Sequence, residues 1–342
     1  MKKCHLIVLM IFIFGSVYIR PQSSVSKVGT TAAAFLEIGP GGTAVAMGNA
    51  FVSRANDATA LYWNAAGIAL LPKNEVNVAH TNWIGETAYD YAALVIPLES
   101  FGTIGLSFTS LSTGDMKVTT VDMPEGTGEY FNANDLALGL SYGRKLTERF
   151  SIGITAKYIQ QSIWHMSASA FAIDAGTMFK TDLFGGMVIG ASISNFGTAM
   201  TLSGRDGRKY DRVDATIEGS NEQIPYDIEL DSWSLPLLFR IGVSTDAIKT
   251  NNFRVTIAAD ALHPNNNYES LNVGTEIAYL ESFYIRGGYS SLFLKDSEGG
   301  LSFGIGVNSK MFFSDAEVRF DYAYRNFGRL NDVHTFSAGI RF

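Results

Sequence analysis

In several segments of this chain, charged residues share one face of a two-residue alternation. These are the side chains whose type and spacing could support a chemical function. A ring of one sign would select ions in a pore, whereas balanced signs favour ion pairs. Their parity places six cations and six anions on one interior face. Structural ion pairing is therefore the first interpretation and a conduction path the second. The predicted interior charge network comprises Lys157, Asp174, Arg240, Asp260, Glu276, Arg286, Arg319 and Asp321, with Arg254, Arg341, Asp135 and Glu317 on the same face.

Other catalytic or metal-binding patterns are absent from the sequence. The histidines after residue 5 are His80, His165, His263 and His334, and none has the spacing of a metal-ligand pair. No G-x-S-x-G element forms a nucleophile elbow between a strand and a helix, and there is no glycine-rich phosphate loop before a helix. We therefore expect no enzyme, no cofactor and no metal, with a Ser/His/Asp set assembled only in three dimensions as the alternative.

The elements that carry the charges alternate like half-buried strands. Phe150, Ile152 and Ile154 alternate with Ser151, Gly153 and Thr155, and the same pattern recurs down the chain. One face is bulky and apolar, while the other is Gly, Ser and Ala with sparse charges. A soluble sandwich also alternates, but few charged residues remain here to cover its outside. The bulky face is therefore expected to face lipid and the small face a lumen.

Composition and charge agree with that interpretation. The 342 residues include 34 Gly, 23 Phe and 15 Tyr, and only 17% are charged, which favours an all-β fold. A net charge of −7 without any basic run argues against binding to nucleic acid. Lys2 and Lys3 before an apolar stretch predict a signal peptide over residues 1–22, approximately, and export from the cytoplasm.

The connections between the predicted strands alternate short and long from about Glu75. Short links at one rim and long loops at the other are typical of bacterial outer-membrane barrels. We therefore predict a transmembrane antiparallel β-barrel of about 14 strands over residues 73–342, in contact with outer-membrane lipid. The short links are 144–149, 181–186, 248–252 and 280–282, and the long ones are 111–133, 161–167, 198–232, 263–269, 291–299 and 326–332.

Both ends of this barrel carry a distinctive stretch. The chain closes with HTFSAGIRF, whose Phe336, Ile340 and Phe342 resemble the signal by which the barrel-assembly machinery recognises outer-membrane proteins. Residues 23–72, which contain LYWNAAG, are too rich in small residues for a domain and too apolar for a free tail. Because fourteen strands enclose more space than wall side chains fill, this N-terminal segment is predicted to fold into the lumen as a hatch.

The stretch AMGNAFVSRANDATALYWNAAGIALL resembles the hatch of the FadL-like barrels and, more closely, the PorV/PorQ family. YGRKLTERFSIGITAKYI, FAIDAGTMF, LPLLFRIGVS and FDYAYRNFG resemble successive strands of that family, so the resemblance covers roughly residues 35–342. It implies a hatch turn at Trp63, Asn64, Ala65, Ala66 and Gly67. Ala65 stands where the family usually has proline, which frees the backbone at this turn.

The resemblance implies two functions. In the first, the barrel is a docking component of type IX protein secretion, with secretion components or cargo as partners. Its contact surface would then be the loop 198–232, with Arg205, Arg208, Lys209 and Arg212 followed by Asp227, Glu229 and Asp231, which is otherwise an ordinary solvated loop. In the second, the barrel transports a hydrophobic ligand such as a long-chain fatty acid.

Overall fold

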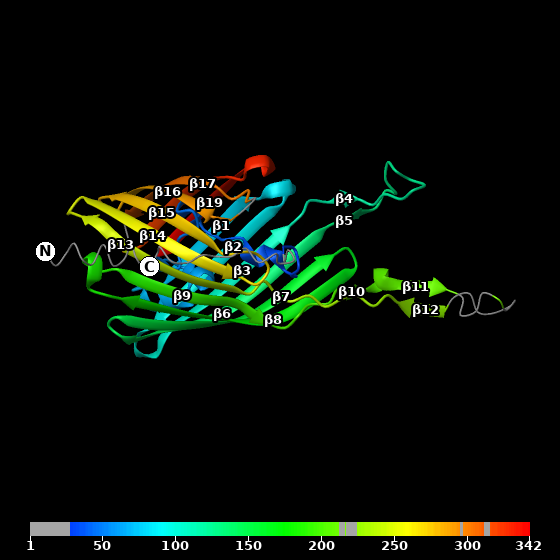
Figure 1. Ribbon diagram of the computed structural model, residues 1–342, viewed down its shortest axis with the longest axis horizontal. Helices are drawn as coiled ribbons and strands as arrows, with labels where there is room; N and C mark the ends of the chain where they lie inside the picture. Colours follow the sequence, from blue (N-terminus) through cyan, green and yellow to red (C-terminus); the bar gives the residue numbers. More distant parts are fainter. Residues whose placement is uncertain (1–27, 212–215, 217–223, 295–296, 311–314) are drawn as a thin grey trace, which may run out of the picture.

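The chain folds into a closed antiparallel β-barrel, as the alternation predicts (Figure 1). The computed structural model describes residues 28–211, 216, 224–294, 297–310 and 315–342, and the predicted signal peptide lies outside them. Within these residues the wall has 14 strands. They are β1 (Glu75–Asn82), β2 (Ala88–Leu98), β3 (Gly102–Ser112), β6 (Ala133–Thr147), β7 (Phe150–Ile163), β8 (Met166–Lys180), β9 (Val188–Gly197), β13 (Leu238–Lys249), β14 (Phe253–Pro264), β15 (Ser270–Tyr279), β16 (Phe283–Leu292), β17 (Leu301–Lys310), β18 (Glu317–Asn326) and β19 (Asp332–Arg341).

Neighbours along the chain pair with one another around the wall, and the first and last strands close it. β1 pairs with β2 on one side and with β19 on the other, with Glu75 opposite Arg341. The backbone N–H of Phe342 donates to the carbonyl of Asn74 at 2.9 Å, so the ladder continues past the last strand. Closure leaves the wall without the free edges that an open sheet would expose to lipid.

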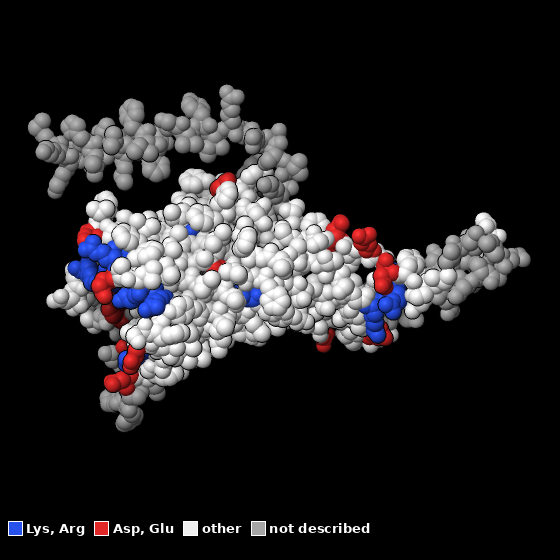
Figure 2. Space-filling model, turned by 90° about the horizontal axis from the view of Figure 1, so that it is seen from below, with Lys and Arg blue, Asp and Glu red and all other residues white. Residues whose placement is uncertain are grey.

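The two faces of the wall differ as predicted. Ile154 and Phe320 on the outer face are 50% and 61% exposed, whereas their neighbours Thr155 and Asp321 on the inner face are 1% and 7% exposed. Lys, Arg, Asp and Glu side chains gather at the two ends of the face in Figure 2 and are sparse between them. An apolar band flanked by two charged rims suits a bilayer-spanning barrel.

The two ends of the barrel also differ. Short turns join the strands at one end, while two ribbons project from the other, β4 (Met116–Lys117) with β5 (Tyr130–Phe131) and β11 (Arg208–Asp211) with β12 (Ile224–Asp227) (Figure 1). The long loop predicted over residues 161–167 is wrong, because only Trp164 and His165 separate β7 from β8. The backbone hydrogen bonds between paired strands form whether the side chains are polar or apolar. The β7–β8 hairpin therefore continues beyond the apolar band.

The remaining elements are short. β10 (Ser203–Gly204) extends the sheet at β8. None of the helices in the described residues is long and apolar enough to cross a bilayer. They are η1 (Ala34–Glu37), α2 (Gly42–Ala46), α3 (Ala60–Trp63), η2 (Ala65–Leu70), η3 (Ile84–Glu86), η4 (Glu99–Phe101), η5 (Leu183–Gly185), η6 (Arg205–Gly207) and η7 (Gly328–Leu330).

Residues 28–72 lie inside the barrel, and we call them the inner segment. Its helix η2 contacts β6, β7 and β8, and its helix α2 contacts β16, β17, β18 and β19 on the other side of the wall. Met47, Phe51 and Val52 of this segment are fully buried. The hydrophobic core of the protein is therefore the packing between the inner segment and the small side chains of the lumen.

Glycines on the inner face allow this close packing. A Cβ added at Gly153 would lie 2.3 Å from the carbonyl carbon of Ala65, and one at Gly176 would lie 2.1 Å from Oδ1 of Asn64. Both distances are far inside van der Waals contact, so only glycine permits the approach. The inner segment therefore packs against the glycine-rich face of the wall, which the sequence analysis predicted to line the lumen.

Candidate functional site

The turn at residues 63–67 is tied to both the inner segment and the wall by Asn64. Its Oδ1 accepts from the backbone N–H of Ala66 at 3.2 Å and so caps η2. Its Nδ2 donates to the carbonyls of Val52 at 2.9 Å and Thr177 at 3.0 Å. Asn64 is 1% exposed, so water cannot reach its side chain. These three hydrogen bonds therefore satisfy polar atoms that would otherwise be buried without a partner.

The other residues of the turn are held by packing and single hydrogen bonds. The indole Nε1 of Trp63 donates to the carbonyl of Pro40 at 3.1 Å, and the hydroxyl of Ser151 on β7 donates to the carbonyl of Ala66 at 3.1 Å. Gly67 has no room for a side chain, since a Cβ there would lie 2.2 Å from the carbonyl oxygen of Ala55. Trp63 alone among the residues of this turn lines one of the cavities in the described part of the chain.

Ala65→Pro is expected to stabilise the protein by about 0.4–1 kcal/mol, because proline restricts the unfolded chain. Ala65 is the first residue of η2, where the helix needs no N–H donor, and Asn64 before it is extended, with φ −164° and ψ 102°. Thermal unfolding in detergent measures the effect. Ala66→Pro is the matched control and should destabilise, because it removes the N–H that Asn64 caps. A lower unfolding temperature for Ala65→Pro would contradict the prediction.

The predicted charge network divides into two groups in the structure. Four of its eight residues meet near the short-turn end. Arg286 pairs with Glu276 through Nε and with Asp321 through Nη1, both at 2.7 Å. Arg319 pairs with Asp321 at 2.8 Å. Arg286 is 2% exposed and Glu276 3%, so these pairs are shielded from water.

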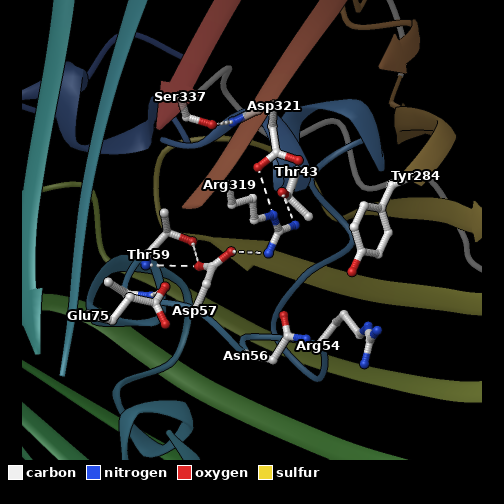
Figure 3. A network of polar contacts seen from close by, with 12 residues as sticks. Thr43, Arg54, Asn56, Asp57, Thr59, Glu75, Tyr284, Arg319, Asp321 and Ser337 are labelled. Atoms are coloured by element: carbon white, nitrogen blue, oxygen red, sulfur yellow. Dashed lines mark hydrogen bonds and ion pairs between the residues drawn. The ribbon is translucent and has the colours of Figure 1, made fainter. Parts of the chain in front are cut away.

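The inner segment completes this first group with two charges that the sequence analysis did not assign. Arg54 pairs with Glu276 at 3.1 Å, and Asp57 pairs with Arg319 at 3.6 Å. In Figure 3 Arg319 lies between Asp57 of the inner segment and Asp321 of β18. Arg54 and Asp57 are conspicuous charges in an otherwise apolar, small-residue stretch, and this is the signal that could have identified them.

The other four predicted residues lie apart from the first group and make separate contacts. Lys157 pairs with Asp174 at 2.8 Å. Asp260 instead accepts the backbone N–H groups of Phe51 at 2.7 Å and Val52 at 2.8 Å, so it holds the inner segment. Arg240 lies against the rings of Tyr62 and Trp63, each 5.4 Å from its guanidinium carbon.

A cavity of about 830 Å³ opens beside the first group at the short-turn end. It is lined by charged residues from the inner segment and the wall, among them Arg54, Glu75, Arg254, Glu276 and Arg341. Most of these charges are paired, as in Arg341 with Glu75 at 2.6 Å and Arg254 with Glu276 at 2.9 Å. Hydrogen bonds from Arg254 lower the pKa of Glu281, in the turn between β15 and β16. The cavity is polar, with both signs on its wall.

Chemistry beyond ion pairing is not evident in the described part of the chain. No cluster of three or more His, Cys, Asp or Glu residues there could hold a metal ion. Of the C-terminal residues, Phe336 lies in the middle of β19 while Ile340 and Phe342 lie at its end, and they are 50%, 44% and 54% exposed. Arg212 of the predicted contact loop lies outside the described residues, whereas Arg205, Arg208 and Lys209 lie on or beside β11.

Comparison with known proteins identifies relatives by sequence model and by fold. The model of the family described as type IX secretion system protein PorV matches residues 21–264. No curated protein matches the chain in sequence.

Solved structures of outer-membrane barrels share the fold. The toluene transporter TodX of Pseudomonas putida is similar at TM-score 0.54 and 13% identity, covering 89% of this chain and 98% of TodX. The toluene transporter TbuX of Ralstonia pickettii gives 0.52 and 12%, covering 89% and 97%. A FadL homologue of Pseudomonas aeruginosa gives 0.50 and 12%, covering 89% and 98%. At such low identity these matches establish the fold alone.

Proposed function

The chain belongs to the PorV family of type IX secretion proteins, and from that premise we propose that it is a non-enzymatic docking component for protein secretion in the bacterial outer membrane. The short turns then face the periplasm and the long loops the cell exterior. Its partners are secretion components or exported cargo.

The observation that carries this proposal is the exposed apolar surface of the ribbon β11–β12. Tyr210 and Tyr226 are 63% and 48% exposed, and the register places them on opposite faces of the ribbon. Ile228 and Trp233 beyond β12 are also close to half exposed. The ribbon projects past the barrel, outside the apolar band that lipid covers (Figure 1). Aromatic side chains exposed outside the membrane, interspersed with charges, mark a protein-binding surface.

The lumen supports docking over conduction. The inner segment crosses it, and most of the buried charges facing it are engaged with one another or with backbone groups. Each contact across the lumen would have to break before a solute passed. A filled lumen is consistent with a barrel that acts through its outer surfaces.

Deleting residues 204–229 is expected to reduce recovery of secretion components or cargo at least tenfold when the protein is purified from solubilised native membranes. The sharper variant is Tyr210→Ser with Tyr226→Ser, which keeps the ribbon backbone and removes its two aromatic rings. Quantitative mass spectrometry of the co-purified proteins measures the effect.

The matched control is Tyr130→Ser on the other projecting ribbon, β4–β5, where Tyr130 is 57% exposed. We expect normal recovery from this control. If recovery stays unchanged both in the deletion of residues 204–229 and in the Tyr210→Ser, Tyr226→Ser variant, the β11–β12 ribbon is not the docking surface.

The alternative is transport of hydrophobic molecules such as long-chain fatty acids, which the shared fold with the toluene transporters favours. In the described residues, however, the cavities of about 830 and 170 Å³ between inner segment and wall are lined by charged residues, and the cavity among Leu36, Leu61 and Tyr62 is only about 20 Å³. That is room for roughly one water. Transport therefore requires the inner segment to move as a hatch, and equal fatty-acid uptake by cells with and without the protein would exclude it.

We also propose that the terminal strand acts in biogenesis. Phe336, Ile340 and Phe342 share the outer face at the end of the chain, where the barrel-assembly machinery can reach them before lipid does.

A further inference from the structure

Arg325 is an inward-facing arginine of the barrel without a carboxylate partner. It belongs to β18 near the long-loop end, two strand positions after Ala323, which is fully buried. Among the described residues neither a hydrogen bond nor an ion pair engages its guanidinium, and its buried Nε has no acceptor. The arginines of the first charge group are paired with carboxylates, whereas Arg240, like Arg325, has no ion pair among the described residues. Arg325 is half-buried, and a cation that is partly removed from water without a counter-charge is costly unless something else neutralises it.

Two aromatic rings fix the guanidinium of Arg325 in place. Its central carbon lies 4.0 Å from the ring centre of Phe327 and 5.7 Å from that of Trp83. These rings pack edge to face with each other at 5.2 Å. Stacking positions the guanidinium plane but supplies no hydrogen-bond acceptor, so the N–H fork stays available to a carboxylate.

Arg325 lines a cavity of about 170 Å³ at the long-loop end. Asn49, Asn272 and Ser290 on its wall carry amide N–H and hydroxyl donors, of which Asn272 Nδ2 donates to the carbonyl of Asn49 and the Ser290 hydroxyl to the carbonyl of Gly300, both at 3.4 Å. Tyr268, which is 48% exposed, also lines the cavity, so the cavity reaches the loop surface. Its volume exceeds that of one water many times over.

The other charges of the cavity do not neutralise Arg325. Glu37 of the inner segment also lines it, but it accepts from Nδ2 of Asn266 at 3.3 Å. Arg240 is a second arginine on the cavity wall, so the described lining has two arginines and one glutamate and carries an excess of positive charge.

We propose that this cavity is a carboxylate-binding site, with Arg325 as the anchor and the neighbouring amides as supporting contacts. Arginine holds carboxylates in a two-pronged geometry that suits a fixed guanidinium. The polar wall fits a carboxylate at the end of a peptide, and a free small carboxylate has the same chemistry. The site lies in the lumen mouth and is independent of the β11–β12 ribbon, so it goes beyond the docking proposal.

Calorimetric titration of the purified full chain in detergent tests the site with three probes. These are N-acetyl-trialanine as the free acid, the same peptide as its C-terminal amide, and sodium acetate. We expect the acid to bind at least tenfold more tightly than the amide. Binding by acetate as tight as that by the acid assigns the site to free carboxylates, and weaker binding by acetate assigns it to peptide ends.

Arg325→Gln should remove binding of the acid, and Arg325→Lys should weaken it at least tenfold, because lysine keeps the charge but lacks the fork. Arg329→Gln is the matched control on the nearby loop, where the Arg329 side chain is 86% exposed, and it should bind like the wild type. If Arg325→Gln fails to fold, the binding affinity of Arg325→Lys alone tests the role of Arg325. Equal binding of acid and amide, absence of binding, or full affinity in the folded Arg325 variants would overturn the proposal.

Discussion

Arg286→Ala is expected to lower the free energy of unfolding by about 3–5 kcal/mol, the largest effect of any single wall substitution proposed for this protein. The side chain of Arg286 is 0% exposed and bridges Glu276 and Asp321, two carboxylates whose side chains are each 4% exposed. Removing it leaves both carboxylates buried with fewer cations. The penalty therefore comes from the stranded anions rather than from lost packing.

Unfolding in urea, followed by tryptophan fluorescence of the barrel in detergent micelles, measures this effect. Arg286→Lys should fall between wild type and alanine, because one ammonium cannot make both directed contacts as well as the guanidinium. Arg329→Ala is the control, since the exposed pair of Arg329 with Glu298 is worth at most about 1 kcal/mol. Equal losses for Arg286→Ala and Arg329→Ala would show that the buried bridge contributes little.

Gly153→Leu is expected to displace the inner segment and to raise ion conductance through the barrel at least tenfold. Even the first carbon of a side chain at Gly153 would lie 2.3 Å from Ala65 and 2.4 Å from the nitrogen of Ala66. These are backbone atoms, so no rotamer change relieves the overlap and η2 has to leave its seat. Current recordings in planar bilayers measure the opening.

The control for this experiment is Gly287→Leu on the outer face of β16. There the nearest atom to an added Cβ is a ring carbon of Phe303 at 3.6 Å, which is ordinary contact. We expect the wild-type conductance from this variant. A folded Gly153→Leu barrel that stays as closed as the wild type would mean that the inner segment does not seal the lumen.

Strand periodicity was sufficient to predict the wall but not the extent of each strand. Parity placed Ile154 outside and Thr155 inside, because lipid and lumen impose opposite demands on successive residues. The error at residues 161–167 arose where β7 and β8 leave the apolar band. Beyond lipid the two-residue pattern carries no contrast between faces, so the sequence there resembles a loop.

Parity also placed charges on the inner face without showing which ones meet. The pair Glu276 and Arg286 is directly cross-strand and follows from the short turn between β15 and β16. Arg319 and Asp57 meet only because the inner segment crosses the lumen, a contact over more than two hundred residues that no strand pattern contains. Arg325 differs again, since its lack of a carboxylate partner is visible only in three dimensions.

The pairing of β1 with β19 determines the order of events during biogenesis. β1 is the first wall strand to be synthesised. One of its two neighbours is nevertheless β19, the last wall strand along the chain. The ring therefore cannot shut until β19 has been synthesised. Because residues 28–72 precede β1, they have already been synthesised when β19 closes the ring, so the sheet can wrap around them.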